Sequence, residues 1–137
     1  MNGNRIVARI GVVAAGAAAA LVIWALALIG GGIQVALGRG EPADMPWWQV
    51  LAASAVAGLA GWALLAVLEA RLGARARRIW TVIAVVVAVL SLAGPFGTPG
   101  IETGDRFWLA AVHLALAGAY IPLMASTAAR AASLRDA

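Results

Sequence analysis

The chain contains no cysteine and no lysine, and it has only one histidine, one tyrosine and six acidic residues. The absence of cysteine excludes disulfides, thiol redox chemistry, iron–sulfur clusters and zinc–thiolate sites. A lone histidine, with no carboxylate inside any apolar stretch, cannot complete a haem or metal site unless a second copy of the chain supplies another ligand. We therefore expect no metal and no cofactor.

Formal charge is also missing from the interior of four apolar stretches, which cover residues 10–29, 47–68, 79–96 and 107–124. A helix needs roughly 20 residues to cross a hydrocarbon core about 30 Å thick. The chain has 137 residues, of which 64% are hydrophobic, and a soluble domain of this size cannot bury so much apolar surface. The sequence predicts an all-α, integral membrane four-helix up-down bundle, with residues 1–137 forming one transmembrane domain.

The arginines predict the orientation of this bundle. Eight of the ten precede the first stretch, lie between the second and third, or follow the fourth: Arg5, Arg9, Arg71, Arg75, Arg77, Arg78, Arg130 and Arg135. Arg39 and Arg106 lie on the other side. The positive-inside rule then places both termini in the cytoplasm, in a multi-pass protein of the plasma membrane. The net charge of +4 is explained by this topology, so we expect no nucleic acid as a partner.

An alternative for the first stretch is a cleaved secretory signal, because residues 17–20 are four alanines that mimic a cleavage site. Cleavage there would leave three spans. The apolar run of 20 residues exceeds the 7–15 residues that are typical of a signal, so we favour a retained first span.

Arg106, His113 and Tyr120 recur at steps of seven and therefore share one face of the fourth predicted helix. Polar groups inside a membrane usually face the bundle interior or a wet cavity. The stripe predicts a ligand pocket, with Arg106 at its outer mouth and Trp62, in the middle of the second stretch, as an aromatic wall. The simpler alternative is that His113 and Tyr120 only hydrogen-bond neighbouring helices, and that Trp62 packs in the core or faces lipid.

Glu69 and four arginines, Arg71, Arg75, Arg77 and Arg78, gather at the predicted cytoplasmic rim. They are candidates for binding anionic lipid headgroups, to which each basic residue contributes about 1 kcal/mol. The alternative is that the arginines only set the topology and that one of them neutralises Glu69.

Several short strings resemble a known family: residues 61–69 (GWALLAVLE), 77–83 (RRIWTVI) and 91–95 (SLAGP), with the pairs 113–114 (HL) and 121–122 (IP). They are similar to a family of small actinobacterial four-span membrane proteins that is known only as a domain of unknown function. The resemblance implies a fold and a compartment but no reaction. The chain also resembles small multidrug transporters in outline, yet its first stretch lacks the glutamate on which their proton and cation exchange depends.

The sequence favours a non-enzymatic structural or interaction component of the membrane, which would assemble with itself or with another membrane protein. Small residues at the spacings Ser54-x3-Gly58 and Ala57-x3-Gly61 are typical of close helix contacts. The alternative function is binding of an apolar small molecule or lipid between the second and fourth spans. A transporter or an enzyme is a remote alternative, because Ser54, Ser91 and Thr81 have no acid or second histidine to activate them.

Overall fold

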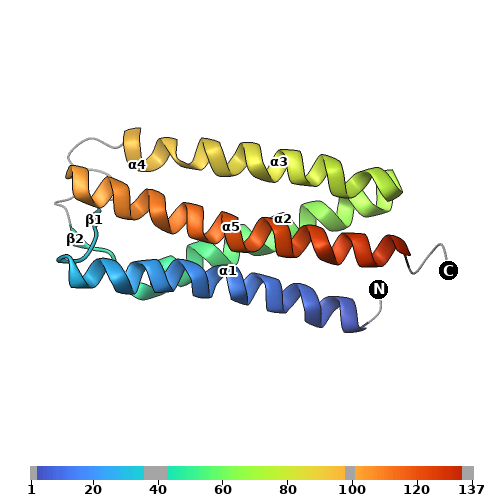
Figure 1. The fold of residues 1–137 in the computed structure, drawn as a ribbon, viewed down its shortest axis with the longest axis horizontal. Coiled ribbons are helices and arrows are strands. Elements are labelled where there is room, and N and C mark those ends of the chain that lie inside the picture. The colour runs from blue at the N-terminus through green and yellow to red at the C-terminus, as the bar shows by residue number, and fades with distance from the viewer. Residues whose placement is uncertain (1–2, 36–42, 98–100, 134–137) are drawn as a thin grey trace.

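The computed structural model describes residues 3–35, 43–97 and 101–133, and side chains as far as residue 128. The prediction of an all-α chain is confirmed. The helices are α1 (Gly3–Ile29), α2 (Trp47–Leu72), α3 (Ala76–Ser91), α4 (Ala93–Gly97) and α5 (Thr103–Ser133). The long helices lie side by side and alternate in direction; α5 lies between α1 and α3, and α2 crosses behind them (Figure 1).

Three segments of the described chain are long and apolar enough to cross a membrane: Gly3–Ile29, Trp47–Gly97 and Thr103–Ala128. The middle segment has 51 residues, which would extend about 75 Å as one straight helix, far beyond a hydrocarbon core of about 30 Å. It instead folds back on itself, so that α2 and α3 are antiparallel (Figure 1). These helices indicate a small membrane protein.

The reversal between α2 and α3 depends on Gly73, whose φ is +54°. L side chains rarely adopt this conformation, whereas glycine adopts it without steric cost. The 3-10 helix η1 (Gly73–Arg75) joins the two helices directly. At the end of the bundle opposite this turn, α3 ends at Ser91, and α4 continues the chain after a break at Leu92.

At the opposite end of α2 the chain forms a pair of strands that the sequence analysis did not predict. β1 (Gln34–Val35) pairs antiparallel with β2 (Ala43–Asp44), after Gly31 ends α1 with a φ of +109°. The indole Nε1 of Trp24 donates a hydrogen bond of 2.8 Å to the carbonyl of Met45 and thereby ties this hairpin to α1. We call this end of the bundle the hairpin end.

The close packing of α1 depends on glycine. A Cβ on Gly58 would lie 3.0 Å from Cγ1 of Val13, and a Cβ on Gly16 would lie 3.0 Å from Cδ1 of Leu116. Small residues let helix backbones approach where lipid supplies no hydrophobic drive for association. α1 therefore contacts both α2 and α5 closely, whereas the backbones of α2 and α5 lie mostly apart.

Large apolar side chains remain exposed along every long helix. They include Val22 and Leu28 on α1, Val56 and Val67 on α2, Val82, Val89 and Leu90 on α3, and Phe107 on α5. In water such a surface would aggregate, because soluble monomers rarely expose apolar patches of this extent. In a bilayer the same surface is the contact with lipid.

Candidate functional site: a pocket between α2, α3 and α5

A pocket of ≈ 550 Å³ lies between α2, α3 and α5, and residues of all three helices line it. This volume lies within the range of about 300–1,000 Å³ that is typical of small-molecule sites. Its walls are mostly alanine, glycine, valine and leucine residues. Among the residues that the structure describes, none of those lining the pocket is charged.

The most exposed part of the pocket lining lies on the flank of the bundle. The lining residues that are themselves exposed lie on α2 and α3: Ala53, Ala57, Ala60 and Leu64 on α2, and Val87 on α3. The lining residues from α5 are all buried or half-buried. The opening therefore lies between α2 and α3, on a surface whose neighbouring side chains are apolar.

The floor of the pocket is built by Tyr120 and Trp80, whose ring centroids lie 5.9 Å apart. The Tyr120 hydroxyl donates a hydrogen bond of 2.6 Å to the carbonyl of Gly58, and the Trp80 indole Nε1 donates one of 2.8 Å to the carbonyl of Gly61. Both polar tips are therefore used in holding α2, and their rings present apolar surface to the pocket.

Glycine is needed at position 61 for this arrangement. A Cβ there would lie 2.7 Å from the hydroxyl oxygen of Tyr120, closer than real Cβ atoms approach. The small-residue spacing that the sequence analysis noted on α2 thus makes room for an aromatic ring of α5.

Polar groups line the other end of the pocket, near the hairpin. His113 Nδ1 lies 2.7 Å from the carbonyl oxygen of Leu109. Because a carbonyl oxygen can only accept, Nδ1 must carry the proton, and a neutral imidazole then has Nε2 as an acceptor. The hydroxyl of Ser91 donates to the carbonyl of Ala88 over 2.7 Å, which leaves its oxygen able to accept. The side chains of Ser54 and Gln49 also line this region.

The structure brings together two of the four residues proposed for a ligand pocket. His113 and Tyr120 line the pocket, whereas Arg106 and Trp62 do not. Arg106 donates through Nε to the carbonyl of Ile101 and through Nη1 to that of Phe96, over 3.1 and 3.0 Å, and so holds the connection between α4 and α5. Trp62 is half-buried and packs against the buried cluster that contains Trp80 and Tyr120, on a face of α2 that does not line the pocket.

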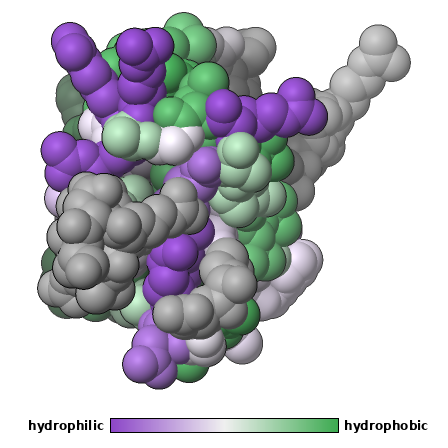
Figure 2. All heavy atoms as spheres, turned by 90° about the vertical axis from the view of Figure 1, so that its right-hand side faces the viewer, coloured by the Kyte–Doolittle hydropathy of each residue, from purple (hydrophilic) through white to green (hydrophobic). Residues whose placement is uncertain are grey.

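The residues proposed for lipid headgroups separate into two sets. Arg71, Arg75, Arg77 and Arg78 are exposed around the turn between α2 and α3, and we call them the turn arginines. Figure 2 looks onto this end of the bundle, the arginine end; hydrophilic residues gather across it and hydrophobic residues lie on its flanks. Glu69 turns away from this set and contacts α1 instead.

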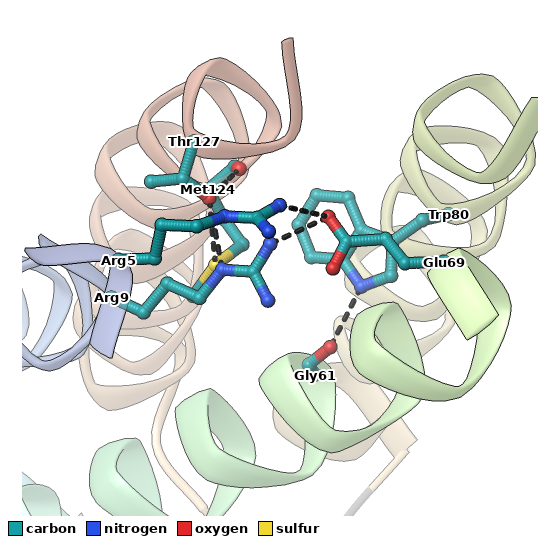
Figure 3. Close-up of polar contacts among 7 residues, drawn as sticks. All are labelled: Arg5, Arg9, Gly61, Glu69, Trp80, Met124 and Thr127. Carbon is teal, nitrogen blue, oxygen red and sulfur yellow. Dashed lines mark hydrogen bonds and ion pairs between the residues drawn. The ribbon is translucent and has the colours of Figure 1, made fainter. Parts of the chain in front are cut away.

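The partners of Glu69 are Arg5 and Arg9, which reach across from α1 (Figure 3). Arg9 Nη2 lies 2.6 Å from Oε1 of Glu69, and Arg5 Nη2 lies 3.8 Å from the same oxygen. Arg9 is fully buried, and its Nε donates to the hydroxyl of Thr127 on α5 over 3.2 Å. This cluster therefore joins three helices through one carboxylate.

From the sequence, Arg5 and Arg9 were interpreted only as topology signals, and this cluster was not predicted. A signal was present in their spacing of four residues, which puts both on one face of a helix. Glu69 was the only acid near the same predicted rim apart from Asp136, which lies outside the described residues. Two arginines on one face of the first helix and a single nearby acid, Glu69, together predict the ion pairs between them.

Comparison with protein-family models decides the family. The model of a family of unknown function, DUF6069, matches residues 2–130. The chain belongs to this family. This membership confirms the predicted resemblance to a family of unknown function, whereas an actinobacterial origin and the number of four spans stay predictions. No curated protein and no solved structure matches the chain.

The function of this family is unknown, and the pocket is the part of the structure that bears on the chemistry of this chain. Its walls offer apolar surface and a few neutral hydrogen-bonding groups. Ser54 and His113 both line it, but no hydrogen bond joins them among the described residues, and the lining there includes no carboxylate to orient the imidazole. Such a site suits binding far better than nucleophilic catalysis.

Proposed function

We propose that this protein is a non-enzymatic component of the plasma membrane that holds one apolar, lipid-like molecule in the pocket between α2, α3 and α5. The observation that carries the proposal is the pocket, which is apolar and opens on the flank of the bundle. A molecule dissolved in the bilayer can enter through such an opening without crossing water. The pocket thus favours the binding hypothesis, the alternative of the sequence analysis, over a purely structural role.

The proposal includes four spans: α1, α2, the pair α3 and α4, and α5. The middle apolar segment reverses at Gly73, so it supplies two of them. The positive-inside rule places the arginine end, and with it both termini, in the cytoplasm. The hairpin end and the polar end of the pocket then lie near the outer leaflet.

The binding hypothesis is tested by blocking the pocket mouth. Ala57 and Ala52 are both exposed on α2, but only Ala57 lines the pocket. We expect Ala57→Trp to remove co-purifying lipid from protein extracted in a mild detergent, as measured by native mass spectrometry. Ala52→Trp is the matched control and should keep the lipid. If wild type carries no bound lipid, or if both variants carry as much as wild type, the binding hypothesis is wrong.

Self-association is a second candidate function, and an exposed small-residue face of α1 favours it. Gly11, Ala14 and Ala18 are exposed on this helix, and a Cβ on Gly11 would have no neighbour within 4 Å. Helices in membranes pair through such faces. The cysteine-free chain allows a direct test: Ala14→Cys should crosslink to a second copy in native membranes, whereas Ala52→Cys should not. A chain that stays monomeric with both variants would exclude this candidate.

The turn arginines are proposed to contact anionic lipid headgroups. All four are exposed at the arginine end, where each contributes about 1 kcal/mol to attraction by an anionic surface. The bilayer is thus the one partner that this proposal requires, and nucleic acid has no role in it.

A further inference from the structure

The pocket has two chemically different ends. Hydrogen bonds between the helices indicate which residues lie at the same height along the bundle axis. Tyr120 on Gly58 and Trp80 on Gly61 set the register of the helices at the floor. His113 lies seven residues from Tyr120 toward the hairpin end, and Ser54 lies seven residues from Gly61 in the same direction. At 1.5 Å per residue His113 lies about 10 Å above the floor, and Ser54 lies about 6 Å from Gly58 and about 10 Å from Gly61.

A second polar level lies farther out. Gln49 is twelve residues from Gly61, and Ser91 is eleven residues from Trp80, so both lie about 16–18 Å from the floor. Between these levels and the floor the walls are apolar. A ligand that fills the pocket therefore meets hydrogen-bonding groups near the hairpin and only hydrocarbon and aromatic surface near Tyr120.

Two of the hydrogen-bonding groups, His113 and Ser91, favour a ligand that donates, whereas the Ser54 hydroxyl can donate or accept. His113 has Nε2 to accept, because its Nδ1 is committed to the carbonyl of Leu109. Ser91 has donated its hydrogen and can accept. The Ser54 hydroxyl, in a side chain that is 3% exposed, makes no hydrogen bond to a described residue. A ligand group that brings its own hydrogen satisfies these acceptors.

The same geometry disfavours an anion. No cation lines the pocket among the described residues; Arg9 lies beyond the floor, at the arginine end, and Arg106 is engaged with carbonyls of the α4–α5 connection. A carboxylate or phosphate beside a neutral imidazole would be desolvated without a counter-charge, which is costly in an apolar site. A neutral group avoids that cost.

The length of the pocket fits one hydrocarbon chain. Its lining on α2 runs from Gln49 to Leu64, fifteen residues or about 22 Å. One leaflet of the hydrocarbon core is about 15 Å deep, half of the whole. From the level of His113 a single chain reaches the floor after about 10 Å, and from the level of Ser91 after about 16 Å. The rest of a longer chain lies in the opening between α2 and α3.

We propose that the pocket selects a neutral single-chain lipid with a hydroxyl group, which donates its hydrogen to Nε2 of His113 while its chain points toward Tyr120 and Trp80. This inference rests on the proposed function, since it names the class of molecule that the pocket binds. Ser54 supports the same hydroxyl, whose oxygen can accept the Ser54 hydrogen.

Three probes of similar length test the selection in nanodiscs of phosphatidylcholine: 1-hexadecanol, methyl hexadecyl ether, which can only accept, and palmitate, which is charged. Occupancy is measured by native mass spectrometry across a titration of each probe. Wild type should bind the alcohol about tenfold more tightly than the ether, the upper range for one hydrogen bond, and palmitate more weakly than the alcohol. His113→Leu should lower alcohol binding to the level of the ether and leave ether binding unchanged. Leu114→Ala, an exposed neighbour outside the pocket, is the control and should keep the preference.

The outcomes separate this inference from the proposed function. Equal binding of the alcohol and the ether by wild type, or preference for palmitate, would overturn the hydroxyl selection while leaving apolar binding intact. Binding of no probe, with Ala57→Trp indistinguishable from wild type, would overturn both. The comparison of alcohol and ether uses wild type alone, so the test holds even if His113→Leu does not fold.

Discussion

Replacing Glu69 with glutamine would leave a fully buried guanidinium without its counter-charge. Arg9 has no exposed side-chain surface, and its Nη2 lies 2.6 Å from Oε1 of Glu69. Its Nη1 already lacks a partner among the described residues. Removing one partner of a buried ion pair costs about 3–5 kcal/mol, because the remaining charge stays buried. The Glu69 side chain is 16% exposed, so we expect the lower end, about 3 kcal/mol of lost unfolding free energy.

Removing the arginine of the pair should lower the unfolding free energy by less. In Arg9→Met, Glu69 keeps Arg5 at 3.8 Å and retains some exposure to solvent, so no charge is left isolated. The longest part of the arginine is hydrocarbon, which methionine replaces. We expect a loss of about 1–2 kcal/mol, and the double variant Arg9→Met with Glu69→Gln should be more stable than Glu69→Gln alone, because it removes the uncompensated charge.

The assay is equilibrium unfolding in mixed micelles of dodecyl maltoside and sodium dodecyl sulfate, followed by tryptophan fluorescence. Arg71→Gln is the matched control: it removes a charge from an exposed position at the same end of the bundle and should change the free energy by less than about 0.5 kcal/mol. If the unfolding free energy of Glu69→Gln lies within about 1 kcal/mol of the wild-type value, the cluster does not join the helices. The same conclusion follows if the double variant is less stable than both single variants.

Three further predictions concern the floor, the rim and the topology. Gly61→Ala should destabilise the protein by about 1–3 kcal/mol in the same assay, since its Cβ would lie 2.7 Å from the Tyr120 hydroxyl, whereas Gly118→Ala, with open space around it, should not. Exchanging all four turn arginines for glutamine should reduce the preference of the protein for phosphatidylglycerol over phosphatidylcholine in nanodiscs, by about 1 kcal/mol for each arginine. The preference is measured by the amount of anionic lipid that the protein retains. Equal retention by the variant and wild type would contradict a headgroup role. Ala74→Cys, in the turn itself, should react with a membrane-impermeant maleimide only after cells are opened; labelling of intact cells would reverse the proposed orientation.

The sequence predicted helices well where one physical requirement dominates. Uncharged runs of about 20 residues must satisfy their backbone hydrogen bonds internally in lipid, so helices occupy all four predicted stretches. The same requirement does not fix where a helix ends. α5 continues to Ser133, well beyond residue 124, because the helical bonds that lipid enforces also persist in the polar rim. The strand pair of Gln34–Val35 with Ala43–Asp44 lies outside the runs, where no such requirement acts.

The pocket was predictable from the sequence only in part. A period of seven places His113 and Tyr120 on one face, and both line the pocket. The period cannot say how a long side chain is used: Arg106 lies in the second turn of α5 and bonds the carbonyls of Phe96 and Ile101, which only a folded connection brings near. The pairing of Arg9 with Glu69 likewise depends on helices 60 residues apart in the chain.

The pocket also bears on why the protein would retain a ligand. Its wall on α2 is built from residues as small as Ala53 and Ala57, while at the floor Tyr120 of α5 and Trp80 of α3 each bond a backbone carbonyl of α2. If the pocket stayed empty, its walls would lose the dispersion contacts that a bound chain supplies. Closing it would require α2 to tilt, and the bonds from Tyr120 and Trp80 to α2 oppose that. On the proposed function, a chain from the surrounding lipid, or a molecule dissolved in it, fills this space and restores those contacts.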